Sequence, residues 1–112
     1  MPRSAALLLL ALCLPSAQAD EAAPLKLVHT LPLPDVEGRI DHLAIDVQGQ
    51  RLFVAALGND TVEVIDLRTG TRAQTLKGFQ EPQGILFLAD LNQLVVTNGG
   101  TGTCELLDGP LF

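Results

Sequence analysis

Asp41 and His42 are the residues of this 112-residue sequence whose types best suit ligand or proton chemistry. An imidazole can form hydrogen bonds, exchange a proton near neutral pH, or ligate a metal. If both residues lie in one strand, however, their side chains point to opposite faces, so we expect no hydrogen bond between them. The preferred interpretation of His42 is therefore structural. The alternative is that Asp41 and His42 contact a ligand, with His42 as a hydrogen-bond donor or as one ligand of a metal.

The other residues with reactive side chains do not form a recognisable catalytic or metal-binding motif. The histidine and cysteine spacings fit neither zinc nor haem, and there is no G-x-S-x-G, P-loop or H-E-x-x-H pattern. The glycine-rich run 99–102 stands between two expected strands, whereas a phosphate-binding loop opens a helix. The sequence therefore predicts no catalytic residue, no metal site and no cofactor, and it does not favour an enzyme.

The charge and the aromatic content argue against a nucleic-acid partner. The formal net charge is −6, and the acidic residues are dispersed along the chain. Nucleic-acid binders present basic patches and stacking aromatic rings, but this chain has no Trp or Tyr and only four Phe. We interpret the acidic residues as solvated strand faces and turns.

Residues 1–19 have the three-part pattern of a secretory signal peptide. Arg3 supplies a positive charge, an apolar run follows over residues 5–14, and small residues stand just before Asp20. The run is too short to cross a membrane, because a helix of this length covers about half of a bilayer core. The sequence predicts cleavage near Ala19-Asp20, export to the periplasm or the cell exterior, and no membrane span.

Cleavage would leave Cys104 as the only cysteine of the exported chain, because Cys13 departs with the leader. A lone cysteine cannot form an internal disulfide. In the repeat described next, Cys104 takes the place of Val62, so we expect a buried apolar side chain rather than a reactive thiol. His29 is expected at the surface.

An internal repeat organises the rest of the chain. When residue 84 is aligned with residue 42, residues 42–66 match residues 84–108 without a gap, and six of the 25 positions are identical. Several of the other positions keep their apolar character. Self-similarity at a fixed period of this size is the signature of a repeat architecture.

Each repeat is expected to hold short strands separated by turns. In the first repeat the predicted strands cover residues 40–46, 51–57, 61–66 and 71–77. Four strands in a repeat of this length match the size of one β-propeller blade. The nearly continuous apolar run 52–57 fits a blade, because neighbouring blades cover both of its faces. A β-sandwich of about seven strands is the competing architecture, and it predicts irregular spacing.

Asp66 and Gly70 are predicted to shape the turn between the third and fourth strands. The carboxylate of Asp66 can accept hydrogen bonds from amides two or three residues on, and Gly70 can adopt a positive φ. Asp108 aligns with Asp66 in the second repeat and receives the same role. All three are interpreted as structural turn residues rather than catalytic ones.

Residues 95–100, Val-Val-Thr-Asn-Gly-Gly, resemble the signature of the YVTN-type β-propeller repeat family. Further stretches that look like blades of exported members of this family are 38–46, 52–55, 59–66 and 80–84. The resemblance implies a closed ring of seven blades, in which residues 25–33 would supply the closing strand. It also implies that Asp41 and His42 lie near the start of an innermost strand, close to the central channel.

The expected organisation has four parts: a signal peptide over residues 1–19, an N-terminal segment over 20–38, a first blade over 39–79, and an incomplete second blade over 80–112. About two blades of an expected seven bury one mutual interface and leave their outer faces and one edge uncovered. We therefore expect a truncated product that is marginal as a monomer. The alternative is self-association through the uncovered faces.

The function predicted from these features is an exported binding or interaction module for an unknown ligand or protein partner. The alternative is the N-terminal fragment of a propeller enzyme, either a lactonase-like hydrolase or a periplasmic redox protein. A lactonase needs polar residues that converge from several blades, and a redox propeller needs haem or metal ligands. Neither set occurs in this sequence. A third interpretation is a remnant without a function of its own.

Overall fold

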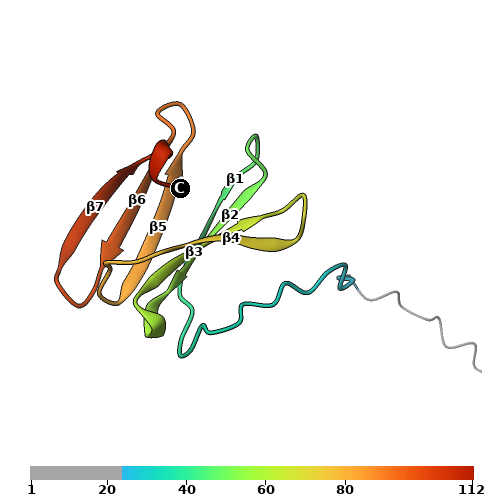
Figure 1. Ribbon diagram of the computed structural model, residues 1–112, viewed down its shortest axis with the longest axis horizontal. Helices are drawn as coiled ribbons and strands as arrows, with labels where there is room; N and C mark the ends of the chain where they lie inside the picture. The colour runs from blue at the N-terminus through green and yellow to red at the C-terminus, as the bar shows by residue number, and fades with distance from the viewer. Residues whose placement is uncertain (1–23) are drawn as a thin grey trace, which may run out of the picture.

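The computed structural model describes residues 24–112, which fold as two antiparallel β-sheets (Figure 1). The first sheet has the strand order β1-β2-β3-β4 and the second has the order β5-β6-β7. The strands are β1 (Leu43–Asp46), β2 (Arg51–Ala56), β3 (Thr61–Asp66), β4 (Thr71–Leu76), β5 (Pro82–Leu88), β6 (Gln93–Asn98) and β7 (Thr103–Asp108). Two single-turn 3-10 helices, Leu57–Asn59 and Gly109–Leu111, follow β2 and β7. The predicted all-β class is confirmed.

The bounds of the strands recur along the chain with the period found in the sequence. Gln93 begins β6 one repeat after Arg51 begins β2, and Thr103 begins β7 one repeat after Thr61 begins β3. The paired positions recur as well, since Val54 lies opposite Glu63 and Val96 lies opposite Glu105. Equivalent residues of the two repeats therefore occupy equivalent places in the two sheets.

The first predicted strand starts three residues later than expected. Asp41 N donates a 2.9 Å hydrogen bond to Ala55 O, and Ala55 N donates one of 3.0 Å to His42 O. Asp41 and His42 therefore both lie opposite the single residue Ala55. This two-against-one pairing is the pattern of a β-bulge, which interrupts the regular ladder. The second repeat has a register shift at the equivalent place, between Pro82 and Ile85. Regular pairing therefore begins at Leu43 rather than at residue 40.

The core lies between the two sheets. One face of the first sheet packs against one face of the second, and residues of β2 are buried on both of their faces, as expected for the apolar run. The buried residues of this core are Phe53, Val62, Val64, Leu76, Phe79, Leu94 and Val96. Partly buried side chains complete it: Ala44, Ile85, Phe87, Leu107 and Phe112.

The segment before β1 runs along the first sheet without joining it as a strand. Arg72 Nη1 donates a 2.8 Å hydrogen bond to Pro34 O, and Gly58 N donates one of 2.9 Å to Arg39 O. Residues 25–33, expected to form a ring-closing strand, are in no strand of the described chain. The predicted signal peptide lies outside the described residues. Among residues 24–112, no helix is long and apolar enough to cross a membrane.

Asp66 and Gly70 shape the turn between β3 and β4. Asp66 Oδ1 accepts hydrogen bonds from the amides of Arg68 at 2.8 Å and Thr69 at 3.4 Å, and Gly70 has a φ of 68°. The Arg68 side chain and amide also lower the pKa of the Asp66 carboxyl. Asp108 differs, because its Oδ1 accepts a hydrogen bond from Gln93 Nε2 at 2.8 Å and a 3-10 helix follows it.

Candidate functional site

Asp41 and His42 contact one another, contrary to the expectation from strand alternation. Nδ1 of His42 lies 2.8 Å from Oδ1 of Asp41, and Oδ2 of Asp41 accepts a 3.3 Å hydrogen bond from Arg39 Nη2. The two side chains lie in contact because neither residue belongs to β1 and the two-against-one pairing with Ala55 interrupts strand alternation, but no hydrogen bond joins the two side chains in the described chain. The Asp41 side chain is 14% exposed, whereas that of His42 is 68% exposed, so a fixed carboxylate holds an accessible imidazole.

The contact with Asp41 defines what His42 can offer. Nδ1 lies against the Asp41 carboxylate, so Nε2 is the ring nitrogen left for other partners. That nitrogen can accept a hydrogen bond from a ligand, take up a proton, or ligate a metal. In the described chain no group of three His, Cys, Asp or Glu residues lies close enough to hold a metal ion.

His42 also stands at the junction of the two sheets. Its amide donates a 3.4 Å hydrogen bond to Gln83 O at the start of the second sheet. The first strands of the two sheets, β1 and β5, lie next to one another in the middle of the molecule (Figure 1). The imidazole is therefore carried by a backbone that both sheets fix.

A second polar cluster, centred on Arg51, ties the turns of the two sheets together. Arg51 Nη2 and Nε donate hydrogen bonds of 2.8 and 3.0 Å to Asp46 Oδ2, and Nη1 donates one of 3.1 Å to Phe112 O. The guanidinium carbon lies 5.0 to 5.5 Å from the centroids of three phenylalanine rings. These rings belong to Phe53, Phe87 and Phe112. The cluster is a structural clamp, because its charges and hydrogen bonds are matched within the chain.

The pKa of Asp46 is held below its ordinary value of 3.8. Burial is the largest single influence and raises the pKa, but hydrogen bonds from the Gly49 amide and from Arg51, with the attraction of the Arg51 charge, together outweigh it. A carboxyl whose pKa is lowered in the folded state stabilises the fold above its unfolded pKa. That contribution is lost as the pH falls through the lowered folded value.

We therefore expect the free energy of unfolding to fall as the pH is lowered below about 4. Urea denaturation at several pH values between 7 and 2 measures this, with Asp66 contributing in the same direction. Asp46→Asn is expected to reduce the dependence on pH. Asp90→Asn, at an exposed turn position, is the control for a change of charge. An unchanged acid dependence in Asp46→Asn would contradict the assignment.

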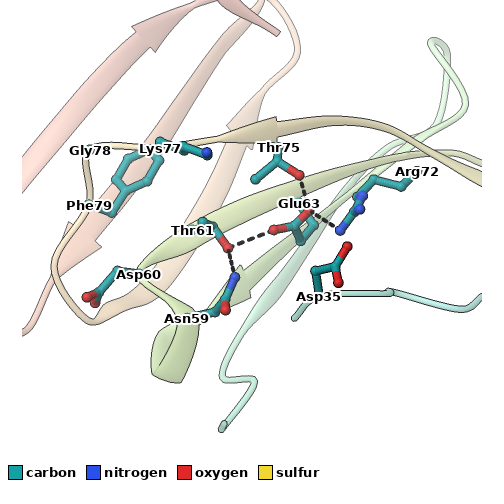
Figure 2. A pocket seen from close by; sticks show the side chains of 10 residues that line it. All are labelled: Asp35, Asn59, Asp60, Thr61, Glu63, Arg72, Thr75, Lys77, Gly78 and Phe79. Atoms are coloured by element: carbon teal, nitrogen blue, oxygen red, sulfur yellow. Dashed lines mark hydrogen bonds and ion pairs between the residues drawn. The ribbon is translucent and has the colours of Figure 1, made fainter. Parts of the chain in front are cut away.

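A cavity lies beside β3 and β4 on the face of the first sheet that points away from the second (Figure 2). Its volume is about 560 Å³, and it is open to solvent. Charged residues of both signs line it, namely Asp35, Asp60, Glu63, Arg72 and Lys77. Glu63 lies at its base and is fully buried.

The polar groups of this cavity are largely bonded to one another. Glu63 Oε1 accepts a 2.7 Å hydrogen bond from the Thr61 hydroxyl, and Oε2 accepts one of 2.6 Å from the Thr75 hydroxyl (Figure 2). Arg72 Nη1 lies 3.4 Å from Oε2, and Asp60 Oδ1 accepts the amide of Glu81 at 2.8 Å. A carboxylate matched in this way holds strands together, so the cavity is a weaker candidate for ligand binding than His42.

Cys104 is exposed, so the expectation of a buried side chain was wrong for the described chain. Its equivalent in the first sheet, Val62, is fully buried because the second sheet packs on it. No further sheet of the described chain packs on the corresponding face of the second sheet.

Arg51 and Glu63 belong to no functional motif in the sequence. For Glu63 a signal was present, because a threonine two residues before a glutamate recurs as Thr103 and Glu105 in the second repeat. For Arg51 there was no such signal, because Gln93 takes its place in the second repeat. No protein-family model and no curated protein matches the chain.

Proposed function

We propose that this chain is an exported β-propeller repeat protein that acts as a binding module and contacts its ligand through His42. The recurrence of strand bounds from one repeat to the next and the resemblance to YVTN-type repeats support the propeller. The pattern of residues 1–19 supports export. The observation that carries the binding role is the contact of 2.8 Å between His42 Nδ1 and Asp41 Oδ1 on a side chain that is 68% exposed, where Nε2 has no partner among the described residues.

The position of the pair supports the same proposal. Propellers bind ligands at the mouth of the channel that their innermost strands surround, and β1 and β5 would be the innermost strands of the first two blades. Ligand sites combine a fixed scaffold with a few convergent polar groups. In this proposal Asp41 orients the imidazole, Arg39 contributes a positive charge beside it, and Nε2 accepts a hydrogen bond from a hydroxyl group of the ligand.

The test follows the histidine NMR signals of the purified chain during titration with small hydroxy acids and, separately, with Zn²⁺. The chain has two histidines, so His29 is an internal control. We expect saturable shifts of the His42 signal without equal shifts of the His29 signal. His42→Ala should weaken binding about tenfold or more, which corresponds to about 1.4 kcal/mol, and His29→Ala should leave it unchanged. Signals that do not move, or that move together, would contradict the proposal.

A lactonase-like hydrolase is the second candidate, and the same contact between Asp41 and His42 favours it. A histidine oriented by a carboxylate can act as a general base on water, with Nε2 taking the proton. Hydrolysis of a simple lactone, followed by the release of acid, distinguishes this candidate from binding alone. Turnover that is lost in both His42→Ala and Asp41→Asn would support it, and binding without turnover would leave the binding module as the function.

A further inference from the structure

The opening of the cavity beside β3 and β4 differs in charge from its base. At the base, Glu63 and Arg72 lie 3.4 Å apart and neutralise one another. Asp35, Asp60 and Lys77 line the same cavity and are exposed to solvent. None of these three side chains has an ion-pair partner in the part of the chain that the structure describes. The cavity therefore combines a matched pair at its base with unmatched charges of both signs at its opening.

Several separate segments build the walls of this cavity. Asp35 lies in the segment before β1, Asp60 lies in the turn between β2 and β3, and Lys77 directly follows β4 (Figure 2). Strands β3 and β4 form its base. All lining residues fall between residues 35 and 79, so the cavity belongs to the first sheet and the segments attached to it. Its volume of about 560 Å³ lies within the range of small-molecule sites.

Hydrogen bonds on both sides fix the wall that carries Asp35. Arg72 Nη1 donates a hydrogen bond of 2.8 Å to Pro34 O, and the amide of Glu37 donates one of 3.2 Å to Asn59 Oδ1. The carboxylate of Asp35 is therefore carried by a backbone that is tied to β4 and to the turn before β3. A site whose polar groups are held in place before binding loses less conformational entropy when the ligand arrives.

The signs of the unmatched charges indicate the class of ligand. A simple anion attracted to Lys77 would also meet the carboxylates of Asp35 and Asp60, and a simple cation would also meet Lys77. A ligand that carries both an ammonium group and a carboxylate can satisfy both signs at once. The lining offers little apolar surface, because Phe79 is only 5% exposed. These features favour a small zwitterion over a large apolar ligand.

We propose that this cavity binds a free amino acid, whose carboxylate contacts Lys77 and whose ammonium group contacts Asp35. The lysine ammonium group donates hydrogen bonds to a carboxylate, and the aspartate carboxylate accepts them from an ammonium group. Asp60 adds a second negative charge that favours the ammonium group. His42 does not line the cavity, so this site does not depend on the ligand of His42.

Titration of the purified chain with L-leucine and two analogues tests the class of ligand. N-acetyl-L-leucine lacks the ammonium group, and L-leucinamide lacks the carboxylate. At about pH 6 the amine of L-leucinamide is protonated, so each analogue differs from L-leucine in one charge. We expect the backbone amide NMR signals of residues 75–79 to shift saturably with L-leucine, and each analogue to bind about fivefold more weakly or worse. Equal binding of the three compounds, or no saturable shift with L-leucine, glycine or L-phenylalanine, would overturn the proposal.

Lys77→Met tests the carboxylate end of the site. The substitution keeps an unbranched apolar stem but removes the ammonium group. The affinity for L-leucine should therefore fall about fivefold or more, while the weaker affinity for L-leucinamide stays unchanged. Lys26→Met is the matched control, because Lys26 is also exposed but lies outside the cavity. Equal losses of affinity for L-leucine and L-leucinamide in Lys77→Met would contradict the placement of the carboxylate.

Asp35→Asn tests the ammonium end of the site. Asp35 has a φ of 64°, a left-handed conformation that asparagine also tolerates, so the turn should be retained. The affinities for L-leucine and L-leucinamide should fall about fivefold or more, whereas N-acetyl-L-leucine should bind as before. Asp90→Asn, at an exposed turn outside this cavity, is the control, and circular dichroism verifies that each variant is folded. If the affinity for N-acetyl-L-leucine fell as far as that for L-leucine, the ammonium group would not be bound by Asp35 and the proposal would be overturned.

Discussion

Arg51→Ala is expected to lower the free energy of unfolding by about 3 kcal/mol or more. The substitution leaves the Asp46 carboxylate, whose side chain is 7% exposed, without its cation. It also removes the hydrogen bonds to Phe112 O and Asn92 Oδ1 that join the first sheet to the end of the second. A buried charge without a partner destabilises far more than a lost surface pair.

Two controls separate the contributions of Arg51. Arg51→Met keeps an apolar stem against the three phenylalanine rings. The difference in unfolding free energy between Arg51→Met and Arg51→Ala therefore measures the packing of the stem. The difference between the natural chain and Arg51→Met measures the charge and the hydrogen bonds. Arg68→Ala removes an arginine that is 70% exposed and paired with Asp66, and it should change stability by less than about 1 kcal/mol. Urea denaturation measures all three. Equal losses in Arg51→Ala and Arg68→Ala would show that the cluster is no clamp.

The strands were predictable because their signals are local. The predicted strand 61–66 is confirmed as β3, and the predicted strands 51–57 and 71–77 each end one residue earlier than expected. β-branched and apolar runs bounded by Gly, Asn and Asp residues are sufficient to place elements of this kind. The shift by one repeat then transfers the bounds of β2 and β3 to β6 and β7 without error.

The candidate site was predicted by residue type but not by geometry. The contact between Asp41 and His42 depends on the two-against-one pairing with Ala55, and alternation along a strand assumes that no residue is inserted. The sequence around Arg51 contains its closest partner, Asp46, but not the groups that tie it to the second sheet, because Asn92 and Phe112 lie far along the chain. Whether Cys104 is buried depends on whether another sheet packs on it. An alignment of the two repeats carries no information about which sheets are present.

Glu63→Ala is expected to lower the free energy of unfolding by about 2 kcal/mol, although Glu63 lies on the face of β3 opposite to the core residues Val62 and Val64. The fully buried carboxylate accepts hydrogen bonds from Thr61 on its own strand and from Thr75 on β4. Its removal leaves both hydroxyls in a partly closed space and leaves Arg72 with Pro34 O as its remaining acceptor. The edge strand β4 and the segment before β1 should therefore loosen together.

The second repeat provides a matched control for this prediction, because Glu105 occupies the position equivalent to Glu63. Glu105 is exposed and accepts one hydrogen bond of 2.8 Å, from Asn98 Nδ2. Glu105→Ala should therefore lower the free energy of unfolding by about 1 kcal/mol or less. Hydrogen exchange should show faster opening of β4 in Glu63→Ala and no such change in Glu105→Ala. Equal effects of the two substitutions would contradict the prediction. They would show that a glutamate at this strand position stabilises either sheet to the same extent, whether or not β4 and the preceding segment bury it.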